Sequence, residues 1–402
     1  MIAAESQRVG RHEFILLMST MFATIAFSVD AMLPALPQIA ADLDLYEPGQ
    51  APLVLIVFMV GLGAGTLIAG PLSDAFGRKP IVYLGIVVYI IGAMIAWLTQ
   101  SFDWMIMGRF VQGFGAAGPR IVSLAIIRDL YVGRDMARIM SLTLMIFLIF
   151  PAIAPAIGAA IIDYAGWRAI FAVFVLFGLF LLVWFGLRVQ ETLPQNRRRP
   201  LRFGKIIQAV AEMFRNTTAR ISIFVQTLML GTLFGLLTMV QPIFAETFDR
   251  AESFPYWFGA IALLSGLSSL LNSRIVGRFG MSQLVTWALI LQIFLSVSAL
   301  ILIWTPGSWD FPVYVVWQFG VLFQAGLTVA NLNALAMKEM GHIAGIAASV
   351  IGAFATVGGA AIAAPLGLLF DGTPRPLIAA TLVLAATALA LMQALRRRGV
   401  LD

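Results

Sequence analysis

The sequence contains no cysteine and only two histidines, His12 and His342. Disulfides, thiol nucleophiles and cysteine metal sites are therefore excluded, and a histidine metal site or a serine–histidine triad has too few residues to form. Charge is scarce as well. Asp, Glu, Lys and Arg make up 11% of the 402 residues, whereas soluble domains carry about 25%. We expect no catalytic centre, no metal site and no cofactor.

Hydrophobic residues take the place of the missing charge and make up 60% of the chain. A water-soluble fold of this length could not cover its surface with so few charged side chains. The composition therefore predicts an all-α polytopic membrane protein. A pI near 10 would also suit a nucleic-acid partner, but the placement of the basic residues in loops explains it as membrane topology. We expect a lipid bilayer as partner and no nucleic acid.

Hydrophobic runs of about 20 residues recur along the chain, and each is long enough to cross a bilayer as a helix. Short polar segments join most of them, but a long polar loop follows the sixth. This loop predicts a first six-helix bundle at 1–189, a linker at 190–219 and a second six-helix bundle at 220–402. The twelve predicted transmembrane helices lie near 14–37, 51–72, 80–100, 104–127, 139–162, 168–189, 220–245, 254–275, 283–304, 311–334, 343–369 and 375–395.

Lys and Arg are distributed unevenly between the two ends of these spans. When both termini are placed on one side, that side collects most of the 26 basic residues, and the opposite side holds only Arg168, Arg250 and Arg375. Cytoplasmic loops carry the excess of Lys and Arg in membrane proteins. We therefore expect both termini and the central loop in the cytoplasm.

The stretch GPLSDAFGRKP at 70–80 places charged residues between two oily runs. Gly77 is able to adopt the positive φ that a tight reversal needs. Arg78 holds the loop on the basic side, and Asp74 is placed to pair with a nearby arginine or to meet a helix N-terminus. The residues alone indicate either a topology anchor with solvated charges or a contact that forms in one conformation and breaks in another.

A weaker copy of this turn, VGRFGMSQ, occurs half a chain later. Gly280 takes the place of Gly77, but Gly277 stands where Asp74 would fall, so the copy lacks its acid. Matching turns in two six-span halves predict pseudo-symmetric parallel repeats. Transporters built from such repeats bind substrate near mid-membrane, between the two halves.

Asp30 is the only acidic residue well inside a predicted span. An ionisable group there is costly and is a functional-site candidate by default. Arg109, in the fourth span, is expected at a similar depth, because both lie within about 10 Å of the outer end of their helices. The depths predict a pair, direct or through water. The pair is either a proton-coupling site or a static contact that fixes helix packing.

Two further features accompany this pair. Gln112 lies one helical turn from Arg109, and it either contacts a substrate or bonds to Arg109. In the fifth span, Pro151 and Pro155 interrupt the helical hydrogen-bond ladder and predict a bend, which Gly158 eases.

The loop at 70–80 resembles the loop motif of the major facilitator superfamily at Gly70, Asp74, Gly77 and Arg78. Ala75 departs from the motif, because the family usually has a basic residue there. The resemblance implies a fold of two six-helix bundles and makes this loop a conformational latch.

Three other stretches and a short string resemble motifs of the 12-span drug:proton antiporters, most of all those of the bicyclomycin and chloramphenicol resistance branch. They are DAMLPALPQIAADL (30–43), RFVQGFGAAGPR (109–120), PAIAPAIGAAIIDYAGWRAIF (151–171) and IIRDLY (126–131). In that group the bend of the fifth span favours exchange over leak. The family also arranges spans one, four, seven and ten around the pathway, which implies a substrate cavity lined by Gln112, Gln226, Asn331 and Asn333.

The sequence is thus expected to encode a proton-driven exporter of small apolar or amphipathic compounds, working by alternating access. Asp30 would be the proton site and Arg109 its partner, and the proton gradient would supply the energy. We expect a monomer in a bacterial inner membrane. One alternative is proton-coupled uptake of a small nutrient or organic anion, for which several cavity cations would be usual. A polytopic membrane enzyme is a remote alternative, because the reactive residues are lacking.

Overall fold

The computed structural model describes residues 9–45, 48–147, 149–198, 200–201, 203–304 and 307–397. Within these residues, twelve helical segments are long and apolar enough to cross a membrane. Each of the twelve predicted spans falls on one of them, which confirms the all-helical membrane fold. The chain divides into two compact units, the first drawn from 1–44 and 57–204 and the second from 45–56 and 205–402. The bounds predicted for the two bundles and the linker remain a prediction.

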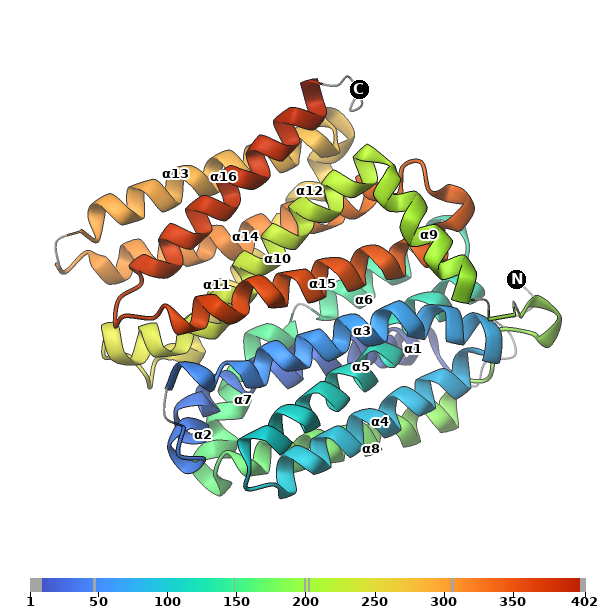
Figure 1. The fold of residues 1–402 in the computed structure, drawn as a ribbon. Coiled ribbons are helices and arrows are strands. Elements are labelled where there is room, and N and C mark those ends of the chain that lie inside the picture. The colour runs from blue at the N-terminus through green and yellow to red at the C-terminus, as the bar shows by residue number, and fades with distance from the viewer. Residues whose placement is uncertain are drawn as a thin grey trace. The chain divides into compact units, whose positions relative to one another are not determined.

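The first unit contains the helices before α3, most of α3 itself and the helices from α4 to α8 (Figure 1). Its helices are α1 (Arg11–Asp30), η1 (Leu33–Ala35), α2 (Leu36–Asp42), α3 (Leu53–Phe76), α4 (Arg78–Leu98), α5 (Phe102–Leu130), α6 (Gly133–Phe147), α7 (Ile149–Ala165), α8 (Arg168–Arg188) and η3 (Gln195–Arg197).

The second unit begins with a short segment around η2 and resumes within α9. Its helices are η2 (Pro48–Gln50), α9 (Phe203–Arg215), α10 (Thr217–Pro242), the π-helix η4 (Ile243–Thr247), α11 (Phe254–Ser265), α12 (Leu267–Phe279), α13 (Met281–Leu302), α14 (Asp310–Met337), η5 (Gly341–Ile343), α15 (Ala344–Leu368) and α16 (Arg375–Arg397).

Small residues allow α4 and α5 to run side by side in close contact (Figure 1). A Cβ atom added to Gly85 would lie 2.8 Å from the carbonyl oxygen of Gly115, and one added to Gly115 would meet the backbone of Tyr89. Transmembrane helices associate through such van der Waals packing, because lipid offers no hydrophobic drive between them. The glycines of α5 thus fix the position of the helix that carries Arg109.

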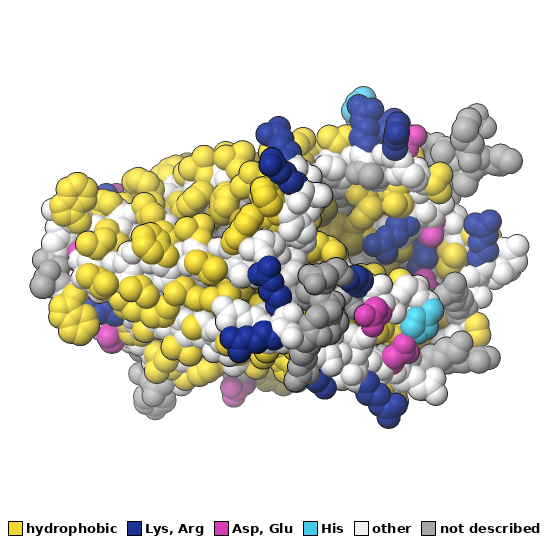
Figure 2. All heavy atoms as spheres, turned by 90° about the horizontal axis from the view of Figure 1, so that it is seen from above, with side chains coloured by type: hydrophobic (Ala, Val, Ile, Leu, Met, Phe, Trp, Pro, Cys, Tyr) yellow, Lys and Arg dark blue, Asp and Glu magenta, His cyan; other side chains and the backbone are white. Residues whose placement is uncertain are grey.

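Each unit has its own apolar core. In the first, α1 residues such as Met18 pack with Ile126 of α5 and Phe185 of α8. In the second, Val225 of α10 and Leu289 of α13 pack together in the same way. On the face seen in Figure 2, hydrophobic side chains cover a broad area, and Lys and Arg gather mainly beside it. This division is what a bilayer requires of a spanning protein.

The fifth span contains the two prolines for which a bend is predicted. Pro151 lies in the first turn of α7, where a helix needs no N–H donor, and Pro155 lies inside the helix. Residue 148, between α6 and α7, lies outside the described residues. The bend itself therefore remains a prediction.

Candidate functional site

The turn between α3 and α4 is built around Gly77, the N-cap of α4, whose φ is 107°. L-residues with a side chain rarely adopt this conformation. The space is also occupied, because a Cβ atom at this position would lie 2.5 Å from Oε2 of Glu191. The predicted tight reversal at Gly77 is confirmed, and glycine is required both for the backbone conformation and for the close approach of a carboxylate.

Arg78 is the centre of an ionic network at this turn. Its side chain is buried, with Nη1 donating to Oδ1 of Asp74 at 2.6 Å and to Oγ of Ser73 at 2.8 Å. Its Nε donates to Oδ2 of Asp129 at 2.9 Å. The hydroxyl of Ser73 in turn donates to the carbonyl oxygen of Gly70 at 2.8 Å. The predicted loop residues Gly70, Asp74, Gly77 and Arg78 are therefore brought together.

Glu191, beyond the end of α8, binds the N-terminus of α4. Its carboxylate accepts from the backbone N–H of Arg78 at 2.9 Å and of Lys79 at 3.1 Å. A carboxylate is favoured there, because the first N–H groups of a helix have no partner within the helix and carry a partial positive charge. The side chain of Lys79 binds the end of α8 in turn, because its Nζ donates to the carbonyl oxygens of Gly186 and Val189. The segment after α8 is thereby fixed to the α3–α4 turn.

Sequence reasoning missed the partners Asp129 and Glu191. Asp129 lies in the string IIRDLY at 126–131, which resembles a motif of the antiporter group. The string draws attention to Asp129, but it does not show that Asp129 binds Arg78. Glu191 lies in the long polar loop and carries no local signal. Both contacts join residues far apart in the sequence, and only the packing of α4, α5 and α8 brings them together.

The turn of the second unit that corresponds to the α3–α4 turn keeps the backbone geometry and lacks the acidic residue. Gly280 has a φ of 82° and precedes α13, as Gly77 precedes α4. Among the ion pairs of the described residues, none involves Arg274 or Arg278. The expected echo of the turn is confirmed in its backbone, and the second turn lacks the acid that pairs with Arg78 in the first.

Asp30 is the last residue of α1 and is buried, with 6% of its surface exposed. Arg109, on α5, is fully buried. Its Nη2 donates to the carbonyl oxygen of Ser28 at 2.9 Å, and its Nη1 donates to Oε1 of Gln112 at 2.7 Å. The described residues show no ion pair between Asp30 and Arg109, but the guanidinium binds the α1 backbone two residues before the carboxyl group. The two residues thus lie at a similar depth, as expected, and the contact that the structure shows between their helices joins the Arg109 side chain to the backbone of Ser28.

The surroundings of Arg109 hold its guanidinium in place. The guanidinium lies over the ring of Phe58, with 4.5 Å between Cζ of Arg109 and the ring centroid. This distance is within the range of a cation–π interaction. Ser28 and Tyr89 bond through their hydroxyl oxygens at 2.7 Å. Of the two alternatives for Gln112, the structure shows the bond to Arg109, and Gln112 is fully buried.

Gly158 brings the proline-containing helix α7 against the turn that follows Asp30. A Cβ atom added to Gly158 would collide with the carbonyl group of Ala31. Any larger residue would push α7 away from the end of α1. Asp30 therefore lies in sequence between the Ser28 carbonyl group, which binds Arg109 of α5, and Ala31, which α7 approaches.

The predicted cavity residues of the second unit differ in their contacts. Asn331 donates to Oδ1 of Asn272 and to the carbonyl oxygen of Leu327, both at 2.7 Å. Gln226 is buried, and its Oε1 has no hydrogen-bond partner within the described part of the chain. Asn333 is half-buried. The bonds of Asn331 favour a role in holding α14 against α12, and Gln226 is the better candidate for contact with a ligand.

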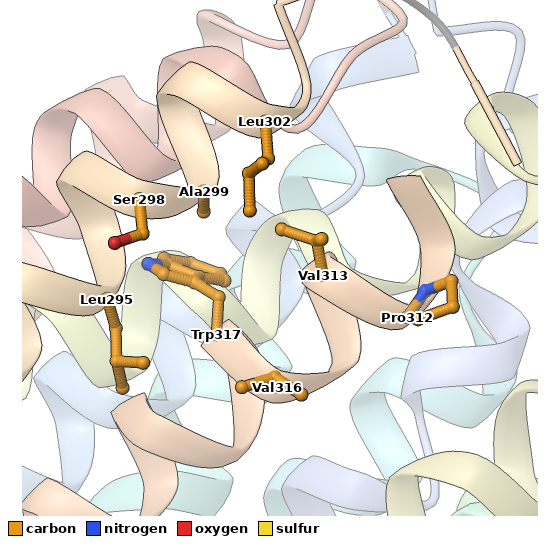
Figure 3. A pocket seen from close by; sticks show the side chains of 8 residues that line it. All are labelled: Leu295, Ser298, Ala299, Leu302, Pro312, Val313, Val316 and Trp317. Atoms are coloured by element: carbon orange, nitrogen blue, oxygen red, sulfur yellow. The ribbon is translucent and has the colours of Figure 1, made fainter. Parts of the chain in front are cut away.

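An apolar groove of about 210 Å³ lies between α13 and α14 (Figure 3). Trp317 and Ala299 form its buried floor, and Leu302 and Val316 are exposed at its edge. Ser298 supplies its one hydroxyl group. Neither the Asp30 site nor the α3–α4 turn contributes a residue to this groove, and a groove of this composition on a spanning protein suits lipid chains.

Comparison with known proteins places these features in a family. The sequence profile of the Major Facilitator Superfamily matches residues 16–364. The bicyclomycin resistance protein homolog of Haemophilus influenzae is 30% identical over 379 residues, which cover 93% of each chain. The multidrug resistance protein MdtL of a Shewanella strain is 28% identical over 329 residues, or 81% of each chain.

A solved structure, that of a D-xylose-proton symporter, shares the fold with a TM-score of 0.71 at 13% identity, covering 94% of this chain and 97% of that one. The chain belongs to the Major Facilitator Superfamily, a family of transporters and not of enzymes, and is a multi-pass membrane protein related to bacterial drug-resistance exporters, with a small molecule as its substrate.

Proposed function

We propose that this protein is a proton-coupled exporter of small apolar or amphipathic compounds that works by alternating access, with Asp30 as its proton site. It would reside in a bacterial inner membrane as a monomer, with both termini in the cytoplasm. The observation that carries the proposal is the buried carboxyl group at the end of α1, next to the backbone contact with Arg109. An acid at such a position is costly and marks ion pathways in membrane proteins.

The surroundings of Asp30 explain how a proton could move helices. Arg109 ties α5 to the backbone of α1 at Ser28, and Gly158 seats α7 on Ala31. A negative carboxylate at residue 30 attracts the guanidinium, and a protonated one does not. A proton therefore changes the balance of forces at the point where three helices meet. Such a difference between two conformations is what couples proton flow to substrate flow.

The network around Arg78 is the second feature to which we assign a role in the conformational change. A contact that forms in one state and breaks in the other stabilises the first state by its own free energy. The bonds of Arg78 to Asp74 and Asp129 and those of Glu191 to the α4 N-terminus join α3, α4, α5 and the segment after α8. We assign to this network the stabilisation of the state seen here.

Asp74→Asn is expected to leave expression near normal, to slow transport several-fold and to shift the balance between inward- and outward-facing states. The side chain of Asp74 is 39% exposed and Asp129 still binds Arg78, so the loss of stability should stay near 1 kcal/mol or below. Spectroscopic distances across this end of the protein would report the shift. Unchanged populations together with unchanged transport would reduce Asp74 to a topology charge.

The export function is tested with a drug-susceptibility panel in a bacterial host that lacks its own pumps. Expression should raise tolerance to a subset of apolar or amphipathic compounds, and a proton uncoupler should abolish intracellular exclusion of those compounds. A host that becomes more sensitive would indicate uptake, the alternative direction for the same fold. If no compound changes in potency or in accumulation, the exporter proposal is wrong.

A further inference from the structure

Arg120 lies deeper in the fourth span than the sequence predicts. The span was expected to end near residue 127, but α5 continues to Leu130. Arg120 is therefore ten residues, or about 15 Å, from the end of the helix. Asp129, which binds Arg78, marks the charged end of the first unit. A hydrocarbon core takes about 20 residues of a helix, so Arg120 lies at the level of that core.

The guanidinium of Arg120 has no hydrogen bond, ion pair or aromatic ring contact within the described part of the chain. Two other arginines of the first unit that lie at its charged end have acidic partners, and Arg128 of α5 is exposed. Arg78 binds two carboxylates, and Arg188 binds Glu13 at 2.8 Å. Asp129, the nearest acid on α5, is already occupied by Arg78 and Thr192. A lone cation within a span is expensive, and such residues face an aqueous cavity and mark substrate pathways.

Arg120 lies on the same face of α5 as Arg109. Eleven residues of an ideal helix make three turns and about 20° more, with an axial separation of about 16 Å. Gly115 and Gly118 face α4, and Gly113 faces α3. Arg120 lies about 20° around the helix from Gly113, on the side of α5 away from α4, and is half-buried. The face that carries the proposed coupling residue therefore carries a second cation three turns away.

We propose that Arg120 binds the acidic group of the substrate, so that the substrates of this transporter are amphipathic organic anions, namely carboxylates or sulfonates on a hydrophobic body. A guanidinium offers paired N–H donors in a fork that fits such groups. The acidic group of the substrate is thus the partner of the Arg120 guanidinium. The inference rests on the proposed function, because it assumes that this face of α5 meets the transported compound.

The test measures binding to the purified protein in detergent, without a proton gradient. The probes are 2-naphthoate and 2-naphthalenesulfonate, each compared with the neutral 2-naphthamide, and the readout is the change in tryptophan fluorescence on titration. The wild-type protein should bind both acids at least about tenfold more tightly than the amide, the factor expected for hydrogen bonds to a charged group. Arg120→Gln and Arg120→Met should lose this preference, and Arg120→Lys should retain part of it.

Arg128→Gln is the matched control, because it removes one positive charge from the exposed end of the same helix. It should bind like the wild type, and thermal unfolding should confirm that all variants are folded. No preference for the acids in the wild type, or an unchanged preference in both Arg120→Gln and Arg120→Met, would overturn the proposal. Because binding needs no gradient, failure of export at Asp30 and failure of anion recognition at Arg120 give separate results.

Discussion

Asp30→Asn is expected to abolish uphill export driven by a pH gradient while leaving the protein folded and able to exchange substrate across the membrane. Asparagine has nearly the shape of a protonated aspartic acid and cannot release a proton, so the site is held in one of its two charge states. Asp30 is buried, and a neutral group is less costly there than a charged one. The variant should therefore be at least as stable as the wild type.

The experiment compares two assays in proteoliposomes for one compound from the susceptibility panel. Accumulation on an imposed pH gradient should fall to the level of empty vesicles in Asp30→Asn, and counterflow without a gradient should persist. Asp103→Asn is the control, because Asp103 lies exposed in the first turn of α5. If Asp30→Asn still accumulates substrate uphill, the coupling site lies elsewhere, and Glu246 near the end of the seventh span becomes the next candidate.

Arg109→Ala is expected to be at least as damaging as Asp30→Asn, and to lower stability as well. It removes the donors that satisfy Oε1 of Gln112 and the carbonyl oxygen of Ser28. Hydrogen bonds to a charged group contribute about 1.5–3 kcal/mol each, and a cavity is left beside Phe58. It also leaves Asp30 buried without a nearby cation. Both export and counterflow should therefore fall, with a lower temperature of unfolding.

Arg109→Lys separates charge from geometry. Lysine keeps the positive charge but lacks the planar fork that reaches two acceptors at once. We expect it to recover stability in part and transport hardly at all. Arg128→Ala, at the exposed end of α5, serves as the control for loss of an arginine from this helix. Wild-type export by Arg109→Ala would show that the guanidinium has only a packing role.

The sequence predicted the fold well because the bilayer imposes simple rules. Each spanning helix needs a hydrophobic run of set length, so twelve spans could be found from composition along the chain. The reversal at Gly77 and its copy at Gly280 were also predictable, since a tight turn requires a positive φ that glycine adopts readily. These signals are local, and a single sequence is sufficient for them.

The partners of the site residues were less predictable, because they depend on packing between distant segments. Asp129 and Glu191 complete the network of Arg78 from positions far along the chain. For Asp30 and Arg109, depth along each helix was a sound guide to proximity, but it could not show that the guanidinium would bind the carbonyl oxygen of Ser28. Helix rotation decides which atom is reached, and α5 is rotated by its glycine contacts with α4.

The depth of Arg120 shows a third kind of limit. The predicted fourth span ends near residue 127, and the helix of the structure continues to Leu130. In the structure Arg128 and Asp129 continue α5, and Asp129 is neutralised by Arg78. A sequence does not show whether a charged residue has a partner in the fold. The end of a helix is therefore hard to predict where such a residue lies close to it.

The most direct test of the account is proton release from the purified protein when substrate binds. In weakly buffered detergent solution, addition of a compound that the wild type exports should release protons, and Asp30→Asn should release none while still binding the compound. Asp103→Asn should behave as the wild type. Proton release of wild-type size from Asp30→Asn would contradict the assignment of Asp30 as the coupling site.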